Sequence, residues 1–123
     1  MKIIKLKKNF EDKRGYISDL FYKKNINHIT LIFSKKGSIR GNNYFKKNYQ
    51  YIYNLGGTFE YWYRNLKNKK IRKKLIKKNQ LIETPPFEIH TLKFKKNNQL
   101  IEFSTLSFRQ KTKLKDSVRY KLI

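Results

Sequence analysis

The sequence predicts an all-β domain, either a sandwich or a barrel of the jelly-roll type. Two observations predict this class. Short apolar or alternating runs recur at hairpin spacing along the 123 residues, and polar turn residues separate them. No stretch has the pattern of a long helix, apart from one ambiguous basic segment. The length suits one well-filled core, so we expect a single domain over residues 1–123.

The first third of the chain contains three predicted strands, Ile3–Leu6, Tyr16–Phe21 and Ile29–Phe33. The residues Asp12–Gly15 form a turn between the first two strands. The residues Lys35–Gly37 end the third strand, which has the strongest pattern of the three.

Two further strands are predicted around a glycine pair in the centre of the chain. The residues of Tyr49–Leu55 alternate between a tyrosine-rich face and a face that carries Gln50. Gly56-Gly57 is a hairpin turn signal. Thr58–Asn65 follows with the same alternation, which places Trp62 on the face opposite its aromatic neighbours.

The basic segment 65–79 fits either a short amphipathic helix or an edge strand. Ile71, Leu75 and Ile76 fall at helical spacing, but this apolar stripe is thin and strands surround it. We therefore predict an edge strand at Lys70–Ile76, guarded by lysine. The remaining predicted strands are Leu81–Thr84, Glu88–Phe94 and Leu100–Phe108, with a loop at Pro85-Pro86.

The formal net charge of +23 has two interpretations. Such basicity is typical of proteins that bind nucleic acid or an anionic membrane surface. The chain is also crowded with Lys, Ile, Asn, Phe and Tyr and has no Ala, which is the composition that an AT-biased genome produces. We favour the second interpretation, and we expect no nucleic-acid partner beyond nonspecific charge binding at low salt.

The sequence also indicates a cellular location. It has no cysteine, which excludes disulfides and cysteine-based zinc sites. It has no apolar run of the roughly 20 residues that a membrane helix needs, and no signal-peptide pattern. We expect a cytoplasmic protein without membrane contact.

The spacing of Gly37, Asn43, Phe45, Gln50 and Gly57 resembles the first motif of the cupin family. In that motif the same intervals carry glycine, His, His, Glu and glycine. The glycines that shape the turns are therefore present, while the residues that hold a metal ion are replaced.

Further features resemble the sugar-nucleotide branch of the RmlC-like cupin superfamily, which includes 3,5-epimerases, 3,4-ketoisomerases and the cupin domain of capsular-sugar reductases. Pro85 and His90 have the spacing of the second cupin motif. Asp12–Gly15 matches an Asp-x-Arg-Gly turn of those proteins, and Arg40-Gly41 matches the pair before the motif His. The resemblance covers about residues 10–123. It implies a single-domain cupin, a jelly-roll-type double-stranded β-barrel, as a homodimer.

The departures from the motif affect the chemistry that the resemblance implies. A cupin metal site uses imidazole and carboxylate ligands because these donate lone pairs to a divalent cation. Asn43 and Gln50 offer neutral amides, Phe45 offers no ligand, and only His90 is retained. We therefore expect no bound metal and no other cofactor.

His90 is the candidate general base, because the pKa of imidazole lies near the working pH. A tyrosine such as Tyr44 or Tyr51 is the candidate acid. The alternative for His90 is a core histidine with one satisfied hydrogen bond.

Five residues are candidates for substrate binding. Arg14 and Arg40 suit a bidentate grip on a diphosphate. Asn43 and Gln50 suit sugar hydroxyls, because an amide both donates and accepts. Trp62 belongs to an aromatic set that suits stacking on a base or sugar. The alternatives are ion pairs for the arginines, mutual hydrogen bonds for the amides, and core packing for the aromatic residues.

The resemblance implies a relative of the sugar-nucleotide epimerases and isomerases of surface-polysaccharide biosynthesis, which binds an anionic sugar nucleotide without a metal. As an enzyme it would be a metal-independent isomerase or epimerase. One alternative is a non-catalytic cupin that acts as a binding or regulatory subunit. The third is a polyanion-binding β-barrel.

Overall fold

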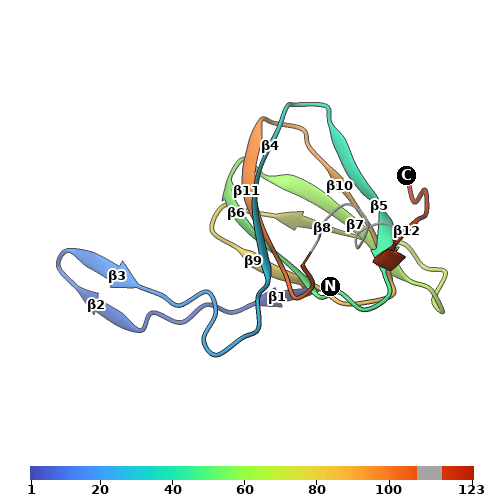
Figure 1. Cartoon of the computed structure of the whole chain (residues 1–123). Helices are drawn as coiled ribbons and strands as arrows, with labels where there is room; N and C mark the ends of the chain where they lie inside the picture. Colours follow the sequence, from blue (N-terminus) through green and yellow to red (C-terminus); the bar gives the residue numbers. More distant parts are fainter. Residues whose placement is uncertain (108–114) are drawn as a thin grey trace.

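Two five-stranded antiparallel sheets face each other in the computed structural model, which describes residues 1–107 and 115–123 (Figure 1). The first sheet contains, in spatial order, β1 (Lys2–Ile4), β9 (Leu81–Thr84), β6 (Gln50–Gly56), β11 (Asn98–Ser104) and β4 (His28–Ser34). The second contains β12 (Ser117–Arg119), β5 (Ile39–Phe45), β10 (Glu88–Lys93), β7 (Phe59–Asn65) and β8 (Arg72–Ile76). The all-β prediction is confirmed.

The main core lies between the two sheets. It forms because each strand alternates, so that every second side chain points inward. The buried residues of this core are Ile52, Phe59, Tyr61, Ile76, Ile82, Leu92, Phe94 and Leu100. Full burial of one such apolar side chain stabilises the fold by about 1.5–3 kcal/mol.

A second apolar cluster covers part of the outer face of the first sheet. Tyr51, Leu81 and Phe103 form its buried centre. The N-terminal segment crosses them, and the Phe21 ring makes edge contacts with Tyr51 at 5.1 Å and Phe103 at 4.8 Å between centroids. The tyrosine-rich face of β6 therefore packs outside the sheets, under the N-terminal segment.

A hairpin of β2 (Phe10–Asp12) and β3 (Gly15–Ile17) projects away from both sheets (Figure 1). It exposes the apolar side chains of Phe10, Tyr16 and Ile17. The predicted strand Tyr16–Phe21 therefore ends at Ile17, because the chain turns back to place Phe21 in the outer cluster.

Two glycines permit close backbone approaches, Gly57 in the turn between β6 and β7 and Gly41 within β5, opposite the register shift of β10. Gly57 has a φ of +76°, and a Cβ there would lie 2.2 Å from the carbonyl oxygen of Asn97. Gly41 has a φ of +91°, and its Cβ would lie 2.8 Å from the carbonyl oxygen of His90. A side chain would be strained and would clash at either position.

β5 is a strand that the sequence pattern does not predict, because Ile39–Phe45 contains a glycine and two asparagines, which are poor strand formers. Pairing with β10 on one edge and β12 on the other forms it nonetheless. The basic segment forms the predicted edge strand and not the alternative helix, since β8 spans Arg72–Ile76. The predicted strand Leu100–Phe108 is too long, because β11 ends at Ser104 and residues 105–107 are not strand, while Phe108 lies outside the described residues.

Among the described residues, no helix is long and apolar enough to span a membrane.

Candidate functional site

The space between the sheets is divided into an apolar half and a polar half. The apolar half holds the large side chains of the main core. At the other end of the same strands the inward positions become polar. We call this end the polar half; its residues are Asn43, Gln50, Thr84, Glu88, His90, Glu102 and Ser104.

His90 lies on β10 and is only 2% exposed. Its ring stacks on Tyr61 with 5.9 Å between centroids, and Phe45 lies at 5.8 Å. The His90 Nδ1 is 3.1 Å from the carbonyl oxygen of Glu88. Because a carbonyl only accepts, we assign the proton to Nδ1, which leaves a lone pair on Nε2. Burial lowers the pKa of His90 to about 4, so the ring is neutral at pH 7.

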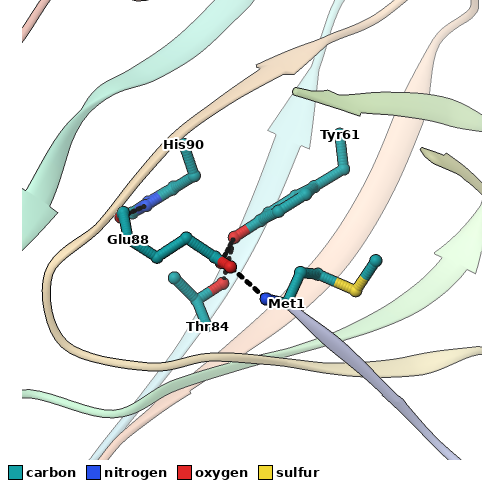
Figure 2. A network of polar contacts seen from close by, with 5 residues as sticks. All are labelled: Met1, Tyr61, Thr84, Glu88 and His90. Atoms are coloured by element: carbon teal, nitrogen blue, oxygen red, sulfur yellow. Dashed lines mark hydrogen bonds and ion pairs between the residues drawn. The ribbon is translucent and has the colours of Figure 1, made fainter. Parts of the chain in front are cut away.

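A buried network joins Tyr61 to Thr84 and Glu88, and Glu88 to Met1 (Figure 2). The Tyr61 hydroxyl lies 2.5 Å from the Thr84 hydroxyl and donates to the Glu88 carboxylate at 2.9 Å. The other oxygen of Glu88 pairs with the amino group of Met1. Burial raises the pKa of Glu88, and burial together with Glu88 raises the pKa of Tyr61 well above its usual value. Tyr61 therefore keeps its proton and acts as a hydrogen-bond donor.

Gln50 and Glu102 form a second polar pair. The amide nitrogen of Gln50 donates to the Glu102 carboxylate at 3.1 Å, across the pairing of β6 and β11. Gln50 is buried, whereas Glu102 is half-buried. Glu102 thus brings a carboxylate to the interior, where it is able to accept hydrogen bonds from ligand hydroxyls.

Asn43 is the cross-strand neighbour of His90, so the two side chains share the inner face of the second sheet. The Asn43 amide donates to the Ser117 hydroxyl at 2.7 Å. Asn43 also pairs in register with Arg119, an exposed cation at the edge of this sheet. The polar half therefore has a positive charge beside its amide and imidazole groups.

The polar half lacks the donor set of a cupin metal centre. Within residues 1–107 and 115–123, no three His, Cys, Asp or Glu side chains gather as a metal cluster. Asn43 and Gln50 are already bonded to Ser117 and Glu102, and Phe45 packs against His90. These residues do not fit a transition metal, and metal-free binding remains a prediction.

Tyr51 lies apart from His90. It is on the outer face of the first sheet, where its hydroxyl donates to Glu83 at 3.1 Å and Lys24 lies over its ring. Burial raises its pKa. Because neighbouring residues of a strand face opposite sides, Gln50 points into the polar half and Tyr51 points away. The tyrosine beside His90 is Tyr61.

The other three predicted binding residues also lie outside the polar half. Arg14 is at the tip of the β2–β3 hairpin, where its hydrogen bonds hold the pKa of Asp12 below its usual value. Arg40 donates to the Ser34 hydroxyl at 2.7 Å and links β5 to β4. Trp62 is half-buried on the outer face of the second sheet, with Lys73 over its ring.

The structure thus brings together His90, Asn43 and Gln50, which the motif spacing had singled out. Sequence reasoning missed Tyr61, Glu88 and Glu102. Glu102 had a detectable signal, since alternation places Leu100 and Glu102 on the same face of a strand. A charged residue on an apolar face is a candidate for function.

Solved structures of sugar-nucleotide enzymes have the same fold. The TDP-fucose-3,4-ketoisomerase WlaRA from Campylobacter jejuni matches with a TM-score of 0.78 and 17% identity, over 95% of this chain and 87% of that one. The 3,4-ketoisomerase QdtA from Thermoanaerobacterium thermosaccharolyticum, in complex with TDP, matches with a TM-score of 0.77 and 17% identity, over 96% and 86%.

The capsular polysaccharide assembling protein CapF from Staphylococcus aureus matches with a TM-score of 0.72 and 16% identity. The match covers 96% of this chain and 35% of CapF, so the chain spans about a third of that protein's length. No protein-family model and no curated protein matches the sequence. The chain has the fold of these enzymes, a cupin-type jelly roll, as the motif spacing predicted.

Proposed function

We propose that the polar half of the interior binds an anionic sugar nucleotide without a metal. The observation that carries this proposal is the set of neutral and acidic hydrogen-bonding groups at one end of the interior, in a fold shared with sugar-nucleotide isomerases over nearly the whole chain. Asn43, Gln50 and Glu102 would bind sugar hydroxyls. Arg119 lies where it would meet the diphosphate.

As an enzyme, the protein would be a metal-independent sugar-nucleotide isomerase or epimerase. Such reactions begin when a base removes the proton next to a sugar carbonyl. His90 is the best candidate, since its neutral ring keeps a lone pair on Nε2. Tyr51 was the predicted acid, but it faces away from this ring. Tyr61 lies beside this ring, but its one proton is donated to Glu88, so we assign no tyrosine as the acid.

A non-catalytic binding or regulatory role is the second candidate. It is favoured by the low pKa of His90, because a base of pKa about 4 has little driving force for proton abstraction at neutral pH. Exchange of the sugar proton in D2O, followed by NMR, separates the two roles. Exchange that His90→Asn abolishes supports catalysis, and ligand binding without exchange supports the binding role.

Arg14 suggests a homodimer. The hairpin that carries it projects away from the sheets of its own chain (Figure 1), so Arg14 would reach a polar half only in a second copy. Exposed apolar residues lie on the hairpin and also on β4, an edge strand that shows Ile29, Leu31 and Phe33 to solvent. Both surfaces are apolar, so contact between the hairpin of one copy and β4 of another would remove apolar side chains from water. Light scattering should give twice the chain mass, and Leu31→Lys should give the monomer.

Thermal-shift measurements with a panel of nucleotide-linked sugars test the binding proposal. A ligand at about 100 times its Kd stabilises the native state by about 2.7 kcal/mol, which raises Tm by several degrees. The free sugar and the nucleoside diphosphate serve as controls for the two parts of the ligand. A flat response to the whole panel would refute the proposal.

A further inference from the structure

The β8 edge of the second sheet, together with the β7–β8 connection, has an unusual charge distribution. Between Glu60 and Glu83 the chain contains nine Lys and Arg residues and no Asp or Glu. The antiparallel pairing of β7 and β8 folds this segment back on itself and concentrates its charge along one edge. The cations of the segment are Arg64, Lys67, Lys69, Lys70, Arg72, Lys73, Lys74, Lys77 and Lys78.

These cations have few acidic partners. Within residues 1–107 and 115–123, Lys73 is the member of this set that forms an ion pair, with Glu60 at 3.3 Å. Burial opposes the ionisation of Glu60, but Lys73 and Lys95 outweigh this effect and lower its pKa. One buried carboxylate therefore faces an edge of like charges, whose repulsion a bound polyanion would relieve.

Aromatic side chains are placed among these cations. Lys73 lies 5.0 Å from the centroid of the Trp62 ring, and Arg64 lies 5.0 Å from that of Tyr120. Phe87 is 47% exposed and lies beside Tyr44, with 6.3 Å between ring centroids. We call Trp62, Arg64, Lys73, Phe87, Tyr120 and the exposed lysines of residues 67–78 the basic aromatic surface.

Phe87 is presented in a strained backbone conformation. Its φ is +62°, in the left-handed region that a bulky residue rarely adopts. Its amide donates to the carbonyl oxygen of Phe45 at 2.7 Å, and its own carbonyl accepts from Leu66. The fold thus holds an exposed ring beside the β7–β8 connection although a glycine would fit there with less strain.

The β2–β3 hairpin provides an internal contrast. It lies on the opposite side of the molecule from the β7–β8 connection (Figure 1). There Lys8 pairs with Glu11 at 2.8 Å and Arg14 pairs with Asp12 at 2.7 Å. A uniform compositional bias toward lysine does not explain why the two hairpin cations Lys8 and Arg14 each have an acidic partner, whereas among the described residues Glu60 is the one carboxylate paired with the cations of residues 64–78.

We propose that the basic aromatic surface binds single-stranded nucleic acid, independently of the sugar-nucleotide proposal. Lysines would contact the phosphates, and unstacked bases would lie on Phe87, Tyr120 and Trp62, because every base has a face that stacks on an aromatic ring. A duplex keeps its bases stacked inside the helix, so it would use only the charges of this surface.

The intrinsic fluorescence of the protein reports on this surface, because Trp62 is the only tryptophan of the chain. We would titrate the protein with an oligothymidylate of about 12 nucleotides in about 0.15 M salt. The expected result is saturable quenching, with weaker binding of a duplex of the same length. Equal affinity for the duplex or for a sulfated polysaccharide of matched charge would overturn the proposal.

Charge-matched variants separate a site from a general charge effect. Lys69→Glu/Lys70→Glu should weaken binding at least about tenfold and reduce the salt slope by about 2. Lys5→Glu/Lys7→Glu makes the same change of net charge near the hairpin and should alter binding by less than about threefold. Equal losses in the two variants would show that binding follows net charge alone.

The variant Phe87→Gly tests whether bases of the single strand stack on the aromatic rings of this surface. Glycine accepts the left-handed φ, so the variant keeps the fold, which its Tm would verify. The loss of one stacked base should weaken oligothymidylate binding about tenfold and leave duplex binding unchanged. An unchanged affinity for the single strand would remove Phe87 from the proposed surface and contradict recognition by stacking.

Discussion

The two halves of the interior lie on the same strands but are held by different interactions, apolar packing in one and side-chain hydrogen bonds in the other. In the apolar half, side chains such as Ile52 and Leu100 pack in one buried cluster, and Asn98 bonds the backbone of Gly56 and Gly57 as well as the side chain of Asn54. In the polar half, side chains bond other side chains, as Gln50 does with Glu102. Stability thus resides in one half, and the capacity to bind a polar ligand in the other.

The largest difference between the halves should appear when large side chains are truncated. Leu100→Ala removes a fully buried side chain from the apolar half and should lower the free energy of unfolding by about 3 kcal/mol. Gln50→Ala, on the neighbouring strand four residues from the pairing partner of Leu100, should cost only about 1 kcal/mol because one hydrogen bond is lost. Urea unfolding measures both. Equal losses would mean that the polar half carries as much of the stability.

The next effect concerns the pH dependence of stability, to which the polar half contributes through His90. The pKa of this ring is about 4 in the native state and near 6.5 when unfolded. Between these values the unfolded state binds a proton that the native state does not. The free energy of unfolding should therefore fall by about 3 kcal/mol as the pH drops from 6.5 to 4.

The His90→Asn variant lacks this titration, so its comparison with the native protein isolates the effect of His90. The raised pKa of Glu88 changes the free energy of unfolding with pH in the opposite direction. The difference in the free energy of unfolding between native protein and variant should shrink by about 3 kcal/mol from pH 7 to pH 4. Urea unfolding at several pH values gives this difference. A constant difference would mean that His90 is accessible to water in the native state.

The two halves were also unequally predictable from the sequence. Alternation predicted the strands that contain Phe59 and Leu100, but not which of their faces is buried. In the polar half, motif spacing identified His90 and Asn43 as neighbours, and the structure pairs them. Alternation placed Tyr61 on the face opposite Trp62, but its bond to Glu88 depends on which strands pair, and a single sequence does not contain that information.

Trp62 and Tyr51 illustrate the same limit. Alternation showed that each lies on a face different from its neighbours, but not which face points inward. The N-terminal segment decides this for Tyr51, because it covers the outer face of the first sheet. The residue types suggested stacking for Trp62 and acid chemistry for Tyr51. The face on which each side chain lies is instead set by long-range packing.

Removal of the Tyr61 hydroxyl should have a moderate effect. Tyr61→Phe keeps the ring that stacks on His90 but removes the bond to the Thr84 hydroxyl and the bond to one oxygen of Glu88, whose other oxygen still pairs with Met1. Buried groups that lose a hydrogen bond cost about 1–2 kcal/mol, and thermal unfolding should show this loss. The double variant Tyr61→Phe/Thr84→Val should recover part of it, since both partners are then apolar. Additive losses would contradict a direct interaction.

The smallest effect on stability is expected at Glu102, and it sharpens the contrast between folding and binding. Glu102→Gln keeps the shape and still accepts from Gln50, so the free energy of unfolding should change by less than about 1 kcal/mol. The Tm increase produced by a nucleotide-linked sugar should nevertheless fall by at least half, because an amide replaces a charged acceptor. Glu83→Gln makes the same change on the outer face, beside Tyr51, and should leave the ligand response intact. If both variants respond to the ligand as the native protein does, Glu102 takes no part in binding, and the polar half serves the fold alone.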